Sequence, residues 1–329
     1  MPELPDVTVY CEAIASRTVG HALTKIRFAS PFVLRTVAPP PSAFEGRRVT
    51  GVSRVGKRIV LAAEGELYVV IHLMIAGRFR WLPPPAPPAT LVPIPGKLGL
   101  AAFDFDSGTL LLTEAATKKR ASIHLCASKA EVLAHHAGGI ELDGCDDVSF
   151  FAALTRENHT LKRALTDPRI LSGIGNAYSD EILWEAQLSP VKLTSKMTLE
   201  EASALLALSR ATLHRFTELL RAQAVKGFPE KVTAVRPEMA VQGRYGEPCR
   251  RCGSKVQRIA YASNETNYCV TCQTGGKLLA DRGLSRLLGQ DWPKSLEDLE
   301  ERKALHSVEP LPGKLVRAPK LVKKRPKLK

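Results

Sequence analysis

The sequence predicts a multi-domain α+β protein, whose N-terminal half is an antiparallel β-sandwich with flanking helices and whose C-terminal half is helical. Three observations support this prediction. Short, alternating, β-branched runs fill residues 23–126, as in strands that bury one face. Apolar residues recur at helical spacing after residue 146, and four cysteines form two close pairs between residues 249 and 272. The 329 residues are enough for two ordinary domains with cores of their own.

The first expected element is a helix over residues 5–18, directly after the unusual start MPELPDV. Pro5 suits the first turn of a helix, because the N–H that proline lacks would have no partner there. Apolar residues follow at helical spacing, and Gly20 is a typical helix stop. We therefore expect the first residues to be held in place, whereas most chain termini fray.

The β-rich region has hairpin-type breaks at AEGE and DSG, which separate runs such as KRIVLAA, LYVVIHLMI and TLLLT. This pattern predicts consecutive antiparallel strands in two packed layers. Residues 83–97 contain seven prolines and cannot form a central strand. We expect them to form a stiff surface loop.

The C-terminal half has two helical features. Thr198 can cap the long amphipathic stretch MTLEEASALLALSRATLHRFTELLRAQAV, with Glu201 completing a capping box. Upstream, LSGIGNAYSDEILWEA places Gly173 and Gly175 in a tight turn before another helix. The start of that helix offers unpaired N–H groups and the side chain of Asn176, which together suit a phosphate. Glycines in such turns recur in DNA-binding proteins, although many of them only bend the chain.

The paired cysteines have the spacing C-x2-C-x16-C-x2-C, which can place four thiolates around one metal ion. The expected ligands are Cys249, Cys252, Cys269 and Cys272. A closed four-thiolate shell is typical of one structural Zn2+, which folds its module and does no chemistry. Since SKVQRIAYASNETNY alternates like a hairpin, we expect a zinc ribbon; the alternative is free or disulfide-bonded cysteines. Three single cysteines are expected to be buried apolar residues, namely Cys11, Cys126 and Cys145.

The formal net charge of +14 indicates a polyanionic partner, most simply nucleic acid. Residues 310–329 carry eight Lys or Arg and no acid, which leaves +6 on the rest of the chain. This tail, expected to be disordered, either contacts nucleic acid or only aids solubility. No apolar run approaches the ~20 residues of a membrane span, and no secretory leader is visible. We expect a cytoplasmic, nucleoid-associated protein, or a nuclear one in a eukaryote.

These features together resemble the formamidopyrimidine-DNA glycosylase / endonuclease VIII family of base-excision repair enzymes. The resemblance rests on PELPDV, GKRIVL, IHLMIAGRF, LSGIGNAYSDEIL and GRYGEPCRRCG…NYCVTCQ, which agree in order and spacing from residue 1 to about residue 273. The start PEL looks like the formamidopyrimidine branch. The resemblance implies a monomer that binds damaged DNA (duplex, bubble or single-stranded) and uses no redox or nucleotide cofactor. The implied parts are a catalytic β-sandwich (1–145), a helix–two-turn–helix domain (146–240), the zinc ribbon (241–275), a short helical extension (276–309) and the basic tail (310–329).

The resemblance implies that the nucleophile is Pro2, whose secondary amine becomes the free N-terminus when Met1 is removed. In the family, this amine attacks C1′ of the damaged nucleotide and displaces the base, and the resulting iminium leads to strand cleavage by elimination. Glu3 would protonate the sugar ring oxygen, and Lys57 would bind phosphate and support the acidity of the site. Asp6 stands where a glutamate is often found and keeps its charge on a shorter side chain. A desolvated, cationic pocket must lower the pKa of the proline amine for it to react.

The resemblance also implies DNA contacts. His72 and Asn176 match phosphate ligands of the family, and Lys162 is placed to reach the same DNA backbone. Ile75 stands at the position of a methionine that fills the gap left by an extruded base. It can still act as an apolar wedge, but a stiffer one, because it is β-branched.

Other positions depart from the family. Its loop with an arginine and a phenylalanine for the gap is replaced by LTEAATKKRASIHL, which has three adjacent cations and no aromatic residue. Gln242 and Asn264 replace a tyrosine and an arginine, and amides bind phosphate without charge assistance. The residues that make and break bonds are kept, while those that open the duplex are altered. This favours a substrate whose damaged base is unpaired or in a single strand, since flipping costs least there.

Three functions stay open at this point. The first is a bifunctional DNA glycosylase and abasic-site lyase. The second is a non-catalytic protein that binds damaged DNA with the same fold, and the third takes the ribbon as a protein- or RNA-binding module. The preferred base is not identified, because residues 224–240, where the family contacts the everted base, lack the Gly-Thr-Thr pattern of an 8-oxoguanine specialist.

Overall fold

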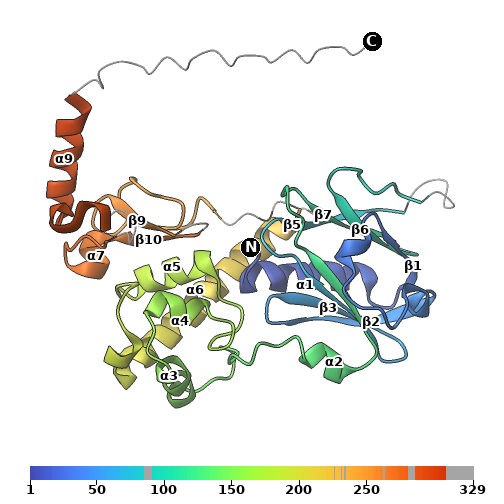
Figure 1. Ribbon diagram of the computed structural model, residues 1–329. Coiled ribbons are helices and arrows are strands. Elements are labelled where there is room, and N and C mark those ends of the chain that lie inside the picture. Colours follow the sequence, from blue (N-terminus) through green and yellow to red (C-terminus); the bar gives the residue numbers. More distant parts are fainter. Residues whose placement is uncertain are drawn as a thin grey trace, which may run out of the picture. The chain divides into compact units, whose positions relative to one another are not determined.

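The computed structural model describes residues 1–84, 91–225, 227–230, 232, 235–261, 264–280 and 286–308 (Figure 1). The chain divides into two compact units, Met1–Gly275 and Gly276–Lys329. Part of the predicted proline-rich loop (85–90) and the predicted basic tail (310–329) lie outside the described residues. The finer domain boundaries expected within the first unit stay predictions.

The predicted N-terminal helix is confirmed as α1, Leu4–Thr18. It begins where the backbone N–H of Glu3 donates to Oδ2 of Asp6 at 2.9 Å, with Pro5 in the first turn. It ends just before Gly20, which has a φ of +83° that a residue with a side chain rarely adopts. The helix packs its buried face, which includes Tyr10 and Ile14, into the main core.

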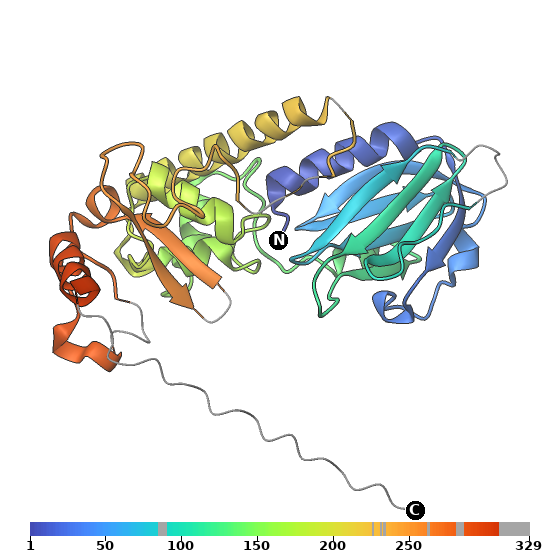
Figure 2. The same cartoon turned by 90° about the horizontal axis from the view of Figure 1, so that it is seen from above.

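The predicted antiparallel β-sandwich is also confirmed. Its eight strands are β1 (Ala22–Phe28), β2 (Arg47–Val55), β3 (Arg58–Ala63), β4 (Leu67–His72), β5 (Gly77–Leu82), β6 (Gly99–Phe105), β7 (Gly108–Glu114) and β8 (Ser122–Cys126). They are hydrogen-bonded in the order β5-β7-β6-β1-β2-β3-β4-β8. The sheet folds over at β1 and β2, which pair through only two residues each, so β5-β7-β6-β1 and β2-β3-β4-β8 form the two layers (Figure 2).

The strand register brings two connections to one end of the sandwich. Gly77, at the start of β5, pairs with Glu114 at the end of β7, and His72, at the end of β4, pairs with Ser122 at the start of β8. The turn between β4 and β5 therefore lies beside the loop between β7 and β8. We call these two connections, residues 73–76 and 115–121, the loop edge.

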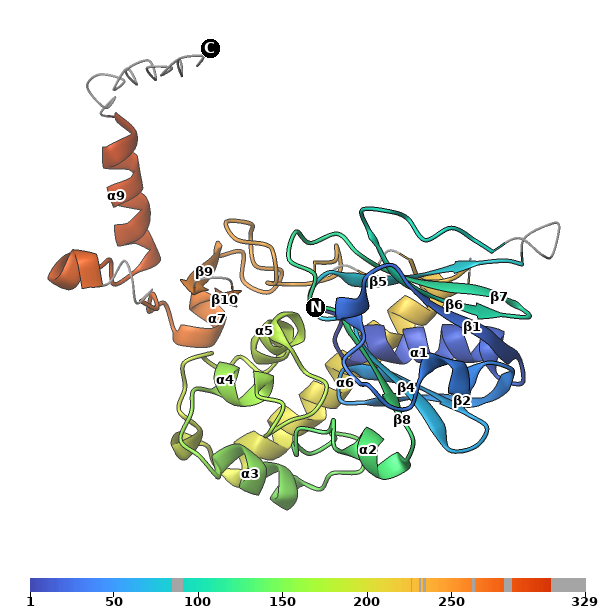
Figure 3. The ribbon, with the colours of Figure 1, turned by 45° about the vertical axis from the view of Figure 1, so that its right-hand side comes forward.

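The helical part of the first unit contains α2 (Lys129–Leu133), α3 (Asp147–Thr155), α4 (Leu161–Thr166), α5 (Asn176–Glu185) and α6 (Leu199–Ala224). The predicted capping box of α6 is present, since Glu201 N donates to Thr198 Oγ1 at 3.2 Å and Thr198 N donates to Glu201 Oε2 at 3.1 Å. Helix α6 runs beside α1, which also lies against β2 and β3 (Figure 3). Single-turn 3-10 helices occupy Pro31–Val33, Pro41–Phe44 and Thr194–Lys196.

The predicted ribbon hairpin is confirmed as β9 (Val256–Tyr261) and β10 (Asn264–Cys269), followed by α7 (Val270–Thr274). In the second unit, a 3-10 turn at Gly289–Asp291 precedes α9, Leu296–Val308. None of the described helices is both long and apolar enough to cross a membrane.

The single cysteines differ from one another. Cys11 and Cys126 are buried, as expected. The expectation was wrong for Cys145, which is only half-buried. It lies in the connection just before α3, where its Sγ donates to the carbonyl oxygen of Asp146 at 3.2 Å.

Candidate functional site

The N-terminus is built into the first unit and is not frayed. Pro2 is buried, and Glu3 exposes only 3% of its surface. The next backbone N–H, from Leu4, donates to the carbonyl oxygen of Gly173 at 2.9 Å. The chain start is thus fixed against the turn that precedes α5, about 170 residues away in sequence.

The carboxylate of Glu3 occupies the N-terminus of α5. It accepts hydrogen bonds from the backbone N–H groups of Gly175 at 2.6 Å, Ala177 at 2.8 Å and Tyr178 at 3.2 Å. A Cβ on residue 175 would lie 2.5 Å from Cδ of Glu3, so this close approach requires glycine. Within the protein, these amides bind a carboxylate, which is an anion as a phosphate is. The predicted phosphate contact at this helix start stays a prediction.

The groups around the N-terminus shift one another's protonation. Burial raises the pKa of Glu3, although the nearby Lys57 and the α5 amides oppose this shift. Burial lowers the pKa of Lys57, whose Nζ donates to the carbonyl oxygen of Ile174 at 2.7 Å. Burial also lowers the pKa of the Met1 amine; the charges of Glu3 and Asp6 oppose this shift, and those of Arg78 and Lys57 add to it. An N-terminal amine in this place is therefore more often neutral than a free one.

Asp6 forms a buried ion pair with Arg236. The NH2 of Arg236 lies 2.6 Å from Oδ1 of Asp6, and the two side chains are 5% and 4% exposed. This pair ties the segment after α6 to the first turn of α1. Arg236 was not predicted from the sequence; the only available signal was that a buried aspartate needs a cationic partner.

A cavity of about 460 Å³ opens beside the N-terminus and is lined by Met1, Lys57 and His72, among others. Burial, with the charges of Arg58 and Lys57, lowers the pKa of His72 to about 4, so its imidazole is neutral at pH 7. Arg58 and His135 also line the cavity, and neither was a candidate in the sequence analysis. The cavity thus combines cations with a neutral donor and acceptor, which suits the polar backbone of an anionic chain.

The predicted wedge residue lies at the tip of the loop edge. Ile75 is 57% exposed in a tight turn that Gly77 N closes by donating to Leu73 O at 2.9 Å. The adjacent Met74 has a φ of +53°, a strained conformation for a residue with a side chain. Arg78, which the sequence analysis missed, donates to the carbonyl oxygens of Ile75 at 3.1 Å and Val232 at 2.6 Å.

The neighbouring loop of this edge is folded around the buried Glu114. Its carboxylate accepts from the N–H groups of Arg120 at 2.8 Å and Ala121 at 3.1 Å, and its carbonyl oxygen accepts from Nζ of Lys119. Within the described residues, the exposed side chains of Lys118 and Arg120 make no hydrogen bond or ion pair. They are therefore available to an external anion.

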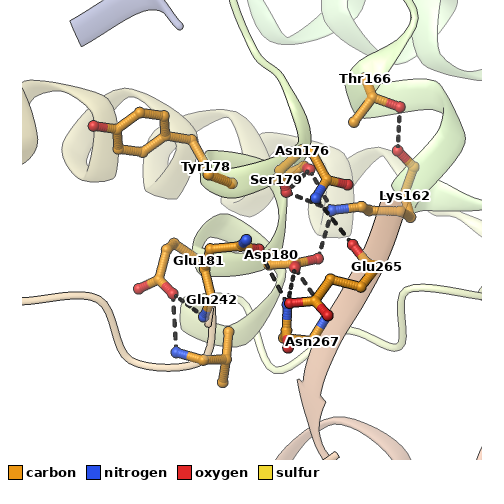
Figure 4. Close-up of polar contacts among 12 residues, drawn as sticks. Lys162, Thr166, Asn176, Tyr178, Ser179, Asp180, Glu181, Gln242, Glu265 and Asn267 are labelled. Atoms are coloured by element: carbon orange, nitrogen blue, oxygen red, sulfur yellow. Dashed lines mark hydrogen bonds and ion pairs between the residues drawn. The ribbon is translucent and has the colours of Figure 1, made fainter. Parts of the chain in front are cut away.

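Lys162 is turned inward (Figure 4). Its Nζ donates to Asn176 O at 2.6 Å, Ser179 Oγ at 2.8 Å and Oδ1 of the fully buried Asp180 at 2.5 Å. Burial raises the pKa of Asp180 to about 6, although Lys162 opposes that shift. The three donors of the ammonium group are thus used inside the protein. The DNA contact expected of Lys162 stays a prediction, and this geometry favours a structural role.

The other amide candidates lie on or near the ribbon side of α5. Asn176 Nδ2 donates to Glu265 O at 2.9 Å, and the buried Gln242 accepts from Asn267 Nδ2 at 3.2 Å (Figure 4). Asn264 is exposed at the start of β10. Of the three predicted contacts, the structure thus leaves only Asn264 with an exposed side chain.

Two buried acids on α5 hold the C-terminal segments against the helix. Asp180 accepts from Asn267 N on β10 at 2.8 Å. Glu181 accepts from the backbone N–H groups of Ala240 at 2.7 Å and of Val241 and Gln242 at 2.9 Å each. Neither acid was a candidate in the sequence analysis, because its partners are backbone groups far away in the chain.

The four predicted cysteine ligands converge, with their sulfur atoms all within 4.8 Å of one another. The Sγ–Sγ distance is 4.0 Å between Cys249 and Cys272 and 3.4 Å between Cys252 and Cys269. Four sulfurs in a tetrahedron at about 2.3 Å from zinc lie about 3.8 Å apart, so the cluster fits the ion. Backbone N–H groups also point at two of these sulfurs: Arg251 N donates to Cys249 Sγ at 3.5 Å, and Cys272 N donates to Cys269 Sγ at 3.4 Å.

Three family models match the chain in succession. They are the formamidopyrimidine-DNA glycosylase N-terminal domain over residues 1–118, the formamidopyrimidine-DNA glycosylase H2TH domain over 143–223, and the zinc finger found in FPG and IleRS over 246–275. The matches cover the sandwich except β8, most of the helical part, and the ribbon.

Curated relatives and solved structures agree with these matches. The formamidopyrimidine-DNA glycosylase of Thermus thermophilus is 31% identical over 280 residues, which cover 84% of this chain and 100% of that protein. The protein of the same name from Heliobacterium modesticaldum is 32% identical over 297 residues, with 83% and 100% covered. The Lactococcus lactis Fpg in complex with abasic-site DNA superposes with a TM-score of 0.71 and 26% identity, over 83% of this chain and 99% of that chain. The same Lactococcus lactis protein with FAPY-dG-containing DNA gives a TM-score of 0.71 and 26% identity, over 83% of this chain and 100% of that chain.

Proposed function

The chain belongs to the formamidopyrimidine-DNA glycosylase family, and from that premise we propose that it is a bifunctional DNA glycosylase and abasic-site lyase that acts through Pro2. Relatives named as DNA glycosylases support the glycosylase activity, and neighbours bound to abasic-site DNA support damaged DNA as the substrate. One Zn2+ holds the ribbon through its four cysteines. We propose a monomer as the active form.

One observation carries the lyase proposal: a carboxylate is held rigidly beside a buried chain terminus. Three backbone N–H groups at the start of α5 fix Glu3, and Pro2 is buried directly before it. The same burial that lowers the pKa of the Met1 amine, against the opposing charge of Glu3, would act on the amine of Pro2 after Met1 is removed. An ordinary α-amine with a pKa of ~8 is neutral about one tenth of the time at pH 7, and a lower pKa raises that fraction.

The proposed reaction begins at the nitrogen of Pro2. The lone pair of the Pro2 nitrogen attacks C1′, the glycosidic bond breaks and the base leaves with the electron pair; it takes up one proton, which balances the proton that the Pro2 nitrogen loses. Glu3 protonates O4′, so the sugar ring opens to an iminium between Pro2 and C1′. The iminium acidifies the C2′ proton; loss of that proton expels the 3′ phosphate, and water then releases the sugar from the amine.

The loop edge supports an unpaired or pre-opened damaged base as the preferred substrate. Ile75 is the exposed apolar tip of this edge, and the loop beside it offers Lys118 and Arg120 in place of an aromatic side chain. Flipping a base from an intact duplex costs a few kcal/mol, and it costs least where the base is unpaired. Faster or equal excision from fully paired duplex than from a bubble or a single strand would contradict this proposal.

The direct test is borohydride trapping with abasic-site DNA. The reductant converts the iminium into a stable tertiary amine. Protein with a verified free Pro2 should therefore become covalently joined to DNA. Protein that retains Met1 is the matched control, because its proline nitrogen is an amide, and it should give no adduct. Absence of an adduct from the Pro2-terminated protein, with DNA binding intact, would instead favour a non-catalytic protein that binds damaged DNA.

A further inference from the structure

Trp184 belongs to α5 by sequence but to the zinc ribbon by packing. It is 8% exposed, and the small apolar cluster around it includes Ala240, Val241, Cys249 and Val256. Its neighbours in that cluster are thus the ribbon and the segment that leads into it. The indole is therefore the part of α5 that enters the core of the ribbon.

The polar atom of this indole points at a zinc ligand. Nε1 of Trp184 donates to Sγ of Cys249 at 3.3 Å, in addition to the backbone N–H of Arg251 at 3.5 Å. Four thiolates around one Zn2+ carry a net charge of about −2, which donors to sulfur spread and stabilise. Because Trp184 and Cys249 are both buried, this hydrogen bond replaces no strong contact with water.

Arg251 fixes the orientation of the indole by stacking on one face of the ring. The guanidinium of Arg251 lies 4.2 Å from the centre of the Trp184 ring, and its NH1 donates to Trp184 O at 2.8 Å. The same guanidinium reaches a carboxylate oxygen of Glu185 at 3.4 Å. A ring held by packing, stacking and a backbone contact presents its N–H in one direction.

We propose that Trp184 is a positioning residue of the zinc centre, which sets the zinc affinity through its hydrogen bond to Cys249 and couples zinc binding to α5. Three contacts then lie along one helix: Glu3 at its first amides, β10 at Asp180 and the zinc thiolate at Trp184. The assignment is independent of the proposed chemistry at Pro2, because zinc affinity is measured without DNA or a reaction.

The test compares Trp184→Phe with Trp184→Ala. Phenylalanine keeps an aromatic ring in the cluster but removes the N–H, whereas alanine removes both. Zinc affinity is measured on the full-length protein by competition with a chromogenic chelator. Loss of an outer-shell donor typically weakens metal binding about 10- to 100-fold, and we expect that loss for Trp184→Phe. Trp81→Phe, in β5, is the matched control and should leave zinc affinity unchanged.

Two results would overturn the assignment. Zinc affinity within twofold of the unsubstituted protein for Trp184→Phe, together with a large loss for Trp184→Ala, would mean that the indole only fills space. The second test needs no change at Trp184. In the double variant Trp81→Phe/Trp292→Phe, Trp184 is the sole indole, and zinc added to the metal-free protein should change its fluorescence; an unchanged spectrum on zinc binding contradicts the contact.

Discussion

The N-terminus and the loop edge hold their charged groups in opposite ways. Around the terminus, Glu3, Asp6 and Arg236 are at least 95% buried, and each has a partner at hydrogen-bonding distance. At the loop edge, Lys118 and Arg120 are exposed, and the apolar tip is strained at Met74. The groups that would make and break bonds are thus buried and fixed by partners, whereas the groups that would contact DNA are exposed and free to adapt.

The largest expected effect is on stability, at the buried ion pair. Asp6→Asn leaves the charge of Arg236 buried without a countercharge, which costs about 3–5 kcal/mol of unfolding free energy. Urea unfolding followed by circular dichroism measures this loss. The matched control is Glu12→Gln, which breaks the exposed pair with Arg221 and should cost less than about 1 kcal/mol. Equal losses for the two variants would remove the contrast between buried and exposed charges.

The second prediction concerns the fit between Glu3 and α5. Gly175→Ala places a Cβ 2.5 Å from Cδ of Glu3 and forces that carboxylate away from the amides. A displacement of about 1 Å at a reacting group can cost about 100-fold in rate, and we expect a loss of that size in single-turnover cleavage of abasic-site DNA. Gly51→Ala is the control, because nothing lies within 4 Å of its added Cβ. Full activity in Gly175→Ala would show that the rigid carboxylate is not needed.

The third prediction concerns the exposed cations of the loop edge. Each phosphate contact changes the slope of log affinity against log salt by about 0.7 for a single strand and about 0.9 for a duplex. The double variant Lys118→Ala/Arg120→Ala should therefore lower the slope for single-stranded DNA by about 1.4, measured by fluorescence anisotropy between low and moderate salt. Lys25→Ala is the matched control. Lys25 is exposed on β1, and its partner in the strand register is Asp104 on β6, toward the opposite end of the sandwich. Identical slopes for the two variants would mean that the loop does not contact DNA.

The smallest effect is expected at the strained turn. The left-handed conformation of Met74 costs roughly 1 kcal/mol or more, and glycine relieves it while losing some entropy on folding. Met74→Gly should thus raise the unfolding free energy by about 0.5 kcal/mol, measured by urea unfolding. Ile75→Gly, at the next residue without a positive φ, should lower it. If both glycines destabilise equally, the turn is not strained at Met74.

How much the sequence predicted depends on whether the signal was local. The cysteine spacing, the capping box of α6 and the alternation of the strands are local patterns, and all three were confirmed. Pro2 and Glu3 were chosen through the family resemblance, and their roles stay predictions. Arg236 and Trp184 were not candidates, because their partners lie 230 and 65 residues away and nothing nearby marks them. Lys162 looked like a free cation, since only the fold reveals that Asp180 lies beside it.

The distance in sequence between Glu3 and α5 also sets an order of events during synthesis. The carboxylate finds its amide partners only after residue 178 has left the ribosome. At about 5–20 residues per second, the chain start waits roughly 9–35 seconds for that helix. During this interval the terminus is free of its final contacts, so an enzyme that removes Met1, as the proposed mechanism requires, would find it accessible. The long-range anchor of Glu3 would then act as a delay, in which Pro2 is uncovered before it is enclosed.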